Sequence, residues 1–214
     1  MKYYDFSVNY VEESYEEFLK VLVDLGYAGV GIVFPKDSLG KIEEAGREAL
    51  DHGLEFFSRY NIAAESLEEF DKEASRYRGK VDILALERLP PKMAERINLK
   101  KVSIIGVENV TGPLIRKIRG RAKPPSLEFN MKKASMLLKE KPHEFGRMLR
   151  MAFLSDLQKV PLIVSSGAED VLDLKPPLQL LYAFQGLIRS EEISKRYIST
   201  LPRPLIPETF GGVG

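Results

Sequence analysis

Short apolar runs alternate along the chain with longer charge-rich segments whose apolar residues recur at helical spacing. We expect strands over seven runs, at residues 2–8, 27–34, 54–64, 81–86, 102–107, 126–129 and 161–165. Strands that alternate with helices favour βαβ units and a parallel sheet. The pattern therefore predicts an α/β fold, a TIM-barrel-like (β/α) barrel that is irregular or incomplete and has about seven parallel strands. A doubly wound sheet is the alternative.

Serine residues mark the expected helix starts. Ser14 with Glu17 and Ser66 with Glu69 have the spacing of capping boxes, and Ser38 is the expected start of the second helix. Further helices are expected over residues 92–97, 111–119, 142–157, 177–188 and 190–199. We assign residues 1–201 to a single barrel-like domain, and residues 202–214, with three prolines and three glycines, to a frayed C-terminal tail.

Composition excludes several kinds of site. The chain has 214 residues and no cysteine, which excludes a disulfide framework, a cysteine-ligated zinc site and a thiol nucleophile. Its two histidines, His52 and His143, form no metal-binding motif, although a carboxylate site for Mg²⁺ stays open. No run approaches the roughly 18 apolar residues of a membrane span and no signal peptide opens the chain, so we expect a cytoplasmic protein without a membrane partner.

The net charge of +1 hides an asymmetry between the halves of the chain. Residues 1–112 carry 15 Lys/Arg against 21 Asp/Glu, whereas residues 113–214 carry 17 against 10. Such crowding of positive charge is costly unless an anion screens it, and RNA phosphates do so by ion pairing and counterion release. The alternative is a solvated face whose acidic partners come from the first half. The expected RNA-binding residues are Arg116, Lys117, Arg119, Arg121, Lys123, Lys132, Lys133, Arg147 and Arg150.

Polar residues at the predicted carboxyl ends of strands are the candidates for chemistry, because barrel enzymes build their sites there. They are Asp5, Glu108, Asn109, Glu128, Asn130, Ser165 and Ser166. A metal-dependent phosphoesterase could use Asp5, Glu108 and Glu128, but helix capping explains such residues more simply, so we expect no catalytic residue and no metal ligand in this chain. Ser165, Ser166 and Gly167 form a candidate phosphate-binding turn, although two acidic residues follow it.

Several segments of the second half carry a resemblance to a known family. They are Ser126-Leu127-Glu128-Phe129-Asn130 before a basic helix, the run 161–168, Lys175-Pro176-Pro177, and the closing stretch from 183 to 199. With these segments the chain resembles the archaeal ribonuclease P protein component 3 family over about residues 100–214. Many relatives have Arg where Lys175 stands. Lysine keeps the positive charge but lacks the planar, two-pronged hydrogen-bonding geometry of arginine.

The resemblance implies a TIM-barrel-like fold and a role as a protein subunit of ribonuclease P. Members of this family pair with ribonuclease P protein component 2, commonly as a two-plus-two assembly, and work with the other subunits. That assembly supports the catalytic domain of the RNA, which removes the 5′ leader of precursor transfer RNA. The RNA uses Mg²⁺, so we expect no cofactor on the chain itself. PHP-type metal phosphoesterases share the fold but need several histidines at strand ends, which this chain lacks.

A protein-interaction module without RNA contact is the remaining alternative. Its apolar contact surface would lie on the helix at 177–188, formed by Leu178, Leu180, Leu181, Phe184 and Leu187. Ordinary packing of that helix against the barrel is the simpler interpretation, and exposure of these side chains distinguishes the two.

Overall fold

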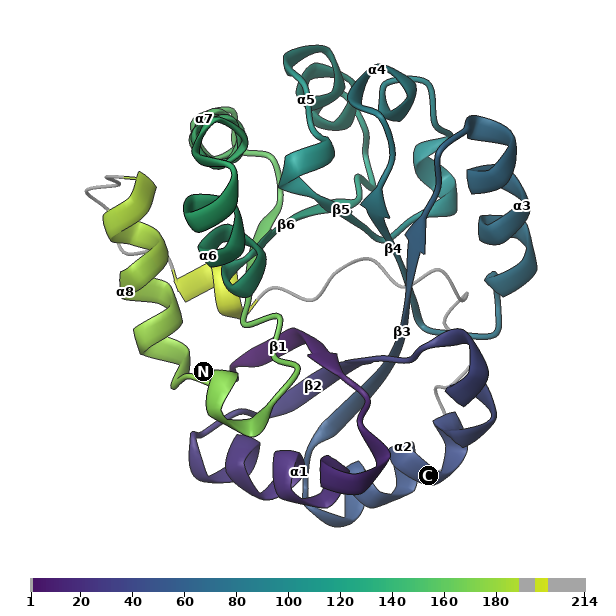
Figure 1. The fold of residues 1–214 in the computed structure, drawn as a ribbon, viewed down its shortest axis with the longest axis vertical. Coiled ribbons are helices and arrows are strands. Elements are labelled where there is room, and N and C mark those ends of the chain that lie inside the picture. Colours follow the sequence, from purple (N-terminus) through teal and green to yellow (C-terminus); the bar gives the residue numbers. More distant parts are fainter. Residues whose placement is uncertain (1, 189–194, 200–214) are drawn as a thin grey trace.

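Seven parallel strands lie side by side in chain order in the computed structural model, which describes residues 2–188 and 195–199 (Figure 1). They are β1 (Tyr4–Asn9), β2 (Gly29–Val33), β3 (Glu55–Ala63), β4 (Ile83–Arg88), β5 (Ile104–Gly106), β6 (Ser126–Asn130) and β7 (Leu162–Ser165). The strand order never reverses, as it would in a doubly wound sheet. The sheet instead curves into a nearly closed barrel, which confirms the TIM-barrel-like prediction.

Helices surround the barrel on its outside (Figure 1). They are α1 (Tyr15–Asp24), α2 (Ile42–Asp51), α3 (Leu67–Tyr77), α4 (Pro91–Ala94), α5 (Gly112–Arg119), α6 (Met131–Glu140), α7 (Pro142–Leu157) and α8 (Pro177–Ile188). Short 3₁₀ helices connect several of these elements, at Glu12–Ser14, Lys36–Lys41, Leu99–Lys101, Val107–Asn109, Val171–Asp173 and Lys195–Ile198. The predicted tail, residues 202–214, and most of the predicted helix 190–199 lie outside the described residues, and 195–198 form a 3₁₀ helix.

The barrel closes where β7 returns to β1. A single bridge joins Val8 to Ala168, three residues beyond the end of β7. The Asn9 backbone N–H donates to the Ala168 carbonyl at 2.8 Å, and the Asn9 side-chain amide donates to the same oxygen at 3.2 Å. The Asp5 carboxylate accepts the Ser166 N–H at 3.2 Å. Because so few backbone bonds close this seam, side chains contribute a large part of the closure.

Two apolar clusters fill the molecule, one outside the sheet and one within the barrel. The larger lies between strands and helices, where Phe18, Phe70 and Phe184 are fully buried. The smaller cluster lies inside the barrel and consists of Tyr4, Phe6, Ile83, Ala85, Ile104 and Ile163, packed against Phe57. Most of its members come from the first half of their strands. Residues nearer the carboxyl ends are polar, so the mouth of the barrel is lined with polar groups.

The predicted helix start at Ser38 is wrong, and the cap at Ser66 is confirmed; α1 does begin directly after Ser14, but Ser14 does not cap it. Ser14 ends the 3₁₀ helix Glu12–Ser14 and makes no capping hydrogen bond, and Ser38 lies within a 3₁₀ helix that delays α2 until Ile42. Ser66 does cap α3, because its hydroxyl accepts the Glu69 N–H at 3.1 Å. The Glu69 carboxylate reaches the N–H of the residue before Ser66 rather than that of Ser66 itself. A serine caps a helix where its own backbone is extended, as it is at Ser66 but not at Ser14.

Candidate functional site

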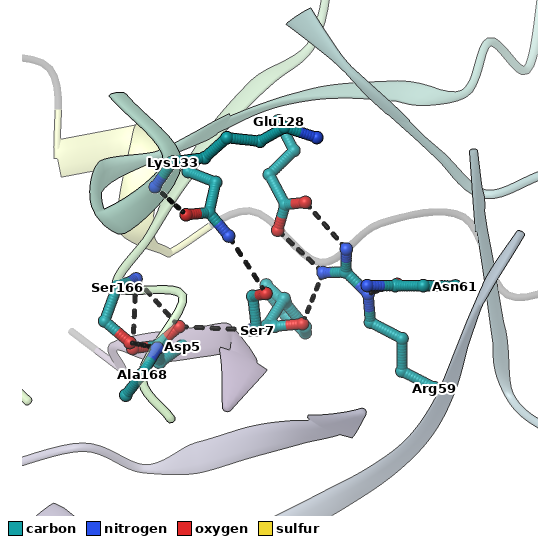
Figure 2. A network of polar contacts seen from close by, with 10 residues as sticks. Asp5, Ser7, Arg59, Asn61, Glu128, Lys133, Ser166 and Ala168 are labelled. Atoms are coloured by element: carbon teal, nitrogen blue, oxygen red, sulfur yellow. Dashed lines mark hydrogen bonds and ion pairs between the residues drawn. The ribbon is translucent and has the colours of Figure 1, made fainter. Parts of the chain in front are cut away.

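A buried ion pair spans the interior of the barrel between β3 and β6. The Arg59 guanidinium donates to both carboxylate oxygens of Glu128, Nη1 to Oε1 at 2.6 Å and Nη2 to Oε2 at 2.7 Å (Figure 2). Nη1 also donates to the Phe6 carbonyl at 2.6 Å, and Nε donates to the Asn61 side-chain oxygen at 2.7 Å. The two side chains are only 2% and 4% exposed. The pair therefore joins β1, β3 and β6, and both charged groups are hydrogen-bonded within the protein.

Strand alternation explains why an arginine points into the barrel. Phe57 packs against the inner apolar cluster, and side chains two residues apart on a strand share a face, so Arg59 and Asn61 also point inward. The guanidinium lies directly above the apolar layer, where a lone charge would be strongly destabilising. Arg59 lies within the strand predicted at residues 54–64 and was not among the predicted site residues. A charged residue at an inward position of a strand is the signal that could have identified it.

A second ion pair lies at the rim beside the first. Lys133 at the start of α6 approaches a carboxylate oxygen of Glu108 at 2.5 Å and also donates to the Glu87 carbonyl at 3.3 Å. Burial raises the pKa of Glu108, and the neighbouring Lys133 ammonium partly offsets that effect. The other carboxylate oxygen, Oε2, is buried and has no hydrogen-bond partner among the described residues.

A third carboxylate belongs to Asp5, the second residue of β1, and is fully buried. It accepts the Ser7 N–H at 3.1 Å and the Ser166 N–H at 3.2 Å (Figure 2). Burial raises the pKa of Asp5, and these hydrogen bonds oppose the effect. Through these hydrogen bonds Asp5 connects β1 to the segment after β7 and so stabilises the closure of the barrel.

The candidate phosphate-binding turn has little donor capacity left for a ligand. The Ser166 N–H is taken by Asp5, and the Ala168 N–H donates to the Ser166 hydroxyl at 3.0 Å. Gly167 adopts a φ of +70°, and a Cβ there would overlap the Asn130 side chain. Phosphate binding by Ser165, Ser166 and Gly167 stays a prediction, because this arrangement by itself suits closure of the barrel.

Glu108, Glu128 and Asn130 do line one cavity at the predicted end of the barrel, whereas Asp5 is the second residue of β1 and contacts the closure seam instead. Each carboxylate has its own partner. Asp5 is held by backbone N–H groups, Glu108 by Lys133 and Glu128 by Arg59. Within residues 2–188 and 195–199, no three His, Asp or Glu side chains are placed to hold one metal ion. The phosphoesterase hypothesis therefore gains no shared metal site from this geometry.

Intramolecular contacts already engage several of the nine predicted RNA-binding cations. Lys117 donates to the carbonyls of Glu95 and Ile97, both at 2.9 Å. Lys132 lies 2.7 Å from carboxylate oxygens of both Glu169 and Asp173. Burial of Lys132 acts to lower its pKa, but these two carboxylates outweigh it and raise the pKa.

Other members of the set are engaged as well. Lys133 pairs with Glu108, and Arg147 donates to the Glu108 carbonyl at 2.9 Å. Lys123 also has a partner within the chain. Lys133 and Arg147 thereby hold α6 and α7 against the Glu108 segment at the rim of the barrel, which gives both cations a structural role.

Four arginines of the predicted set form neither an ion pair nor a side-chain hydrogen bond within the described part of the chain, unlike Arg147. They are Arg116, Arg119, Arg121 and Arg150, from α5, the segment after it, and α7. Arg116, Arg119 and Arg150 are exposed, and Arg121 is half-buried. Their guanidinium groups therefore stay available to an external anion.

The fold and the polar barrel end define the chain as a TIM-barrel-like α/β protein with internally paired carboxylates. The chain is 27% identical to ribonuclease P protein component 3 of Methanococcus maripaludis over 210 residues, which cover 91% of this chain and 87% of that protein. It is 26% identical to ribonuclease P protein component 3 of Methanococcoides burtonii over 207 residues, which cover 89% and 82%. These relatives confirm the resemblance to the component 3 family and extend it to the first hundred residues.

A solved structure shares the fold. A chain in the cryo-EM structure of archaeal ribonuclease P with mature tRNA matches with a TM-score of 0.63 and 22% identity, over 85% of this chain and 82% of that chain. No family model matches the sequence.

Proposed function

We propose that this chain is a protein subunit of ribonuclease P, the counterpart of component 3, and that it supports the catalytic RNA without a complete active site of its own. The observation that carries the proposal is similarity to component 3 proteins over about nine tenths of the chain. The geometry at the mouth of the barrel is consistent with a supporting role, because the carboxylates of Glu128 and Glu108 are already paired with Arg59 and Lys133.

Arg116, Arg119, Arg121 and Arg150 form the core of the RNA-binding surface in this proposal. Arginine is suited to bidentate phosphate contacts, and phosphate contacts dominate the affinity of proteins for nucleic acids. The acidic first half does not neutralise these four arginines. No ion pair within the described residues joins Arg116, Arg119, Arg121 or Arg150 to an acidic residue of the first half, whereas Lys133 does pair with Glu108.

The finer assignments belong to the same proposal. Pairing with ribonuclease P protein component 2, contact with the other subunits, and action on precursor tRNA through the holoenzyme follow from the family resemblance. Mg²⁺ would serve the RNA, not this chain. We also propose a cytoplasmic location; among the described residues no helix is long and apolar enough to cross a membrane.

The interaction-module hypothesis loses most of its contact surface. Leu180, Leu181 and Phe184 of α8 are buried, Leu187 is half-buried, and Leu178 is 39% exposed. The apolar side of α8 therefore packs largely within the protein, as expected for a helix that covers the barrel.

Reconstitution of precursor-tRNA cleavage from the RNA and the other protein subunits tests the proposal. We expect cleavage to be stimulated when the full chain is added, and less so by Arg119→Ala/Arg121→Ala. The control is Arg76→Ala/Arg78→Ala, which removes an exposed pair at the same spacing from the acidic half. Full stimulation by Arg119→Ala/Arg121→Ala would refute the assigned surface, and no stimulation by the unmodified chain would refute the subunit assignment.

A further inference from the structure

A groove between α6 and α8 is left unexplained by the RNA-binding surface described above (Figure 1). Its volume is about 310 Å³, and its apolar lining consists of Met131, Leu180 and Ala183. Ala183 is exposed, Met131 is half-buried, and Leu180 is buried behind them. The lining therefore runs from the surface towards the interior, and the groove is large enough for one apolar side chain.

The two helices that form the groove expose further apolar side chains beside it. Within the described residues nine large apolar side chains are exposed, and seven of them lie between residues 136 and 182. Leu138 is exposed and follows Met131 by seven residues, so the two share a face of α6. Leu178 and Tyr182 of α8 are both exposed and share a face, because they are four residues apart. Apolar surface therefore continues beyond the groove along both helices.

The outer side of α8 lacks the charges that a surface helix ordinarily carries. Helices that cover a protein usually present charged or polar residues to solvent. The twelve residues of α8 include no Asp, Glu, Lys or Arg, whereas each of the helices α1 to α7 has at least one of them. Exposed apolar surface of this kind marks sites of contact with other proteins.

One positive charge at the groove has no carboxylate partner in the described part of the chain. Two lysines line the groove, Lys132 and Lys175. Lys132 lies 2.7 Å from carboxylate oxygens of both Glu169 and Asp173. The Lys175 ammonium donates to the Leu172 carbonyl at 2.7 Å and forms no ion pair within the described residues. Its remaining N–H donors can therefore take a carboxylate from an occupant of the groove.

The backbone that carries Lys175 is fixed by the rest of the fold. The Tyr27 hydroxyl donates to the Lys175 carbonyl at 2.8 Å. Pro176 and Pro177 follow directly, and proline restricts the backbone. A contact surface that is already ordered loses less conformational entropy when a partner binds.

We propose that the groove between α6 and α8 binds an amphipathic helix of another protein, with an apolar side chain in the groove and an Asp or Glu on Lys175. Amphipathic helices bind apolar grooves through anchor residues spaced by three, four or seven positions. Leu138 and Tyr182 contact the anchors on either side of the groove. This inference rests on the proposed subunit role, since the other protein subunits of ribonuclease P are the candidate partners.

Calorimetric titration of the full chain with each of the other ribonuclease P protein subunits, one at a time, tests the inference. Ala183→Trp fills the groove from an exposed position of α8. Ser75→Trp is the matched control, because Ser75 is an exposed small residue of α3 in the acidic half. We expect Ala183→Trp to weaken the binding of one subunit by about tenfold or more, as when an interface anchor is lost, and Ser75→Trp to leave it unchanged.

The charged contact has its own variants. We expect Lys175→Gln to weaken binding of the same subunit and to make that binding less sensitive to salt, because screening then has one ion pair fewer to act on. Lys175→Arg should preserve both. Lys92→Gln is the control, because Lys92 is exposed on α4, forms no ion pair within the described residues and does not line the groove.

Undiminished binding by Ala183→Trp, an equal loss in Ser75→Trp, equal effects of Lys175→Gln and Lys92→Gln, or no binding of any subunit to the unmodified chain would overturn the proposal. A fall in affinity for the catalytic RNA alone would also overturn it, as would self-association of the chain that Ala183→Trp abolishes, because the occupant would then be RNA or a second copy. The subunit assignment stands through all of these outcomes if the unmodified chain still stimulates cleavage by the reconstituted enzyme.

Discussion

Removal of Arg59 tests whether the charged pair inside the barrel holds the fold together. Arg59→Met keeps most of the side-chain length but removes four hydrogen bonds of 2.6–2.7 Å, to Glu128, Phe6 and Asn61. It also leaves the Glu128 carboxylate, which is 4% exposed, without a counter-charge. Breaking a buried pair from one side typically costs about 3–5 kcal/mol. That loss is a large part of the roughly 5–15 kcal/mol by which native domains are stable.

Urea denaturation followed by circular dichroism measures this change in the free energy of unfolding. Arg88→Met is the matched control, because Arg88 pairs with Glu65 at 3.0 Å with side chains 67% and 69% exposed. Exposed pairs of this kind contribute about 0–1 kcal/mol. Arg59→Met/Glu128→Leu should recover much of the lost stability, since an apolar pair leaves no buried charge. An Arg59→Met variant within about 1 kcal/mol of Arg88→Met would refute the assigned role of the pair.

Two further predictions concern the seam and the helix starts. Burial raises the folded pKa of Asp5 above its unfolded value of 3.8, so the native state binds the proton more tightly than the unfolded state. The stability that Asp5 contributes is therefore lost as the pH rises from the unfolded pKa through the folded pKa. Asp5→Asn should remove that fall in a pH series of unfolding free energies, and an unchanged pH profile would contradict it. Ser66→Ala should cost about 1 kcal/mol and Ser14→Ala less than about 0.5 kcal/mol, because the Ser66 side chain makes a cap and that of Ser14 does not. Equal costs in thermal or urea unfolding would show the cap assignment to be wrong.

The architecture was predictable because most strands are short runs rich in apolar residues and bounded by clear breaks, β3 with its Arg59 and Asn61 being the exception. The run at 161–165 becomes β7 at Leu162–Ser165, and that at 126–129 becomes β6 at Ser126–Asn130. Burial on both faces of a parallel sheet requires such runs, so the pattern carries the information directly. Helix starts were less predictable, because the 3₁₀ helix that contains Ser38 and the turned backbone that prevents Ser14 from capping α1 depend on how the loops pack.

The polar interior was not predictable, because its partners are brought together only by the closed barrel. Arg59 and Glu128 are 69 residues apart in sequence, and nothing local indicates that they pair. The two adjacent lysines after β6 show the same limit, since Lys132 contacts Asp173 while Lys133 contacts Glu108. Sequence identifies a concentration of charge, but only tertiary structure separates the cations with internal partners from those left available to an external anion.

The salt dependence of affinity for the catalytic RNA tests most directly whether the internally unpaired arginines bind phosphate. Each phosphate contact adds about 0.7–0.9 to the slope of log affinity against log salt concentration. We therefore expect Arg119→Ala/Arg121→Ala to weaken binding and to reduce this slope by about two. Arg76→Ala/Arg78→Ala, in the acidic half, should leave both unchanged. An unaltered slope in the first variant, or an equal reduction in the second, would contradict the account.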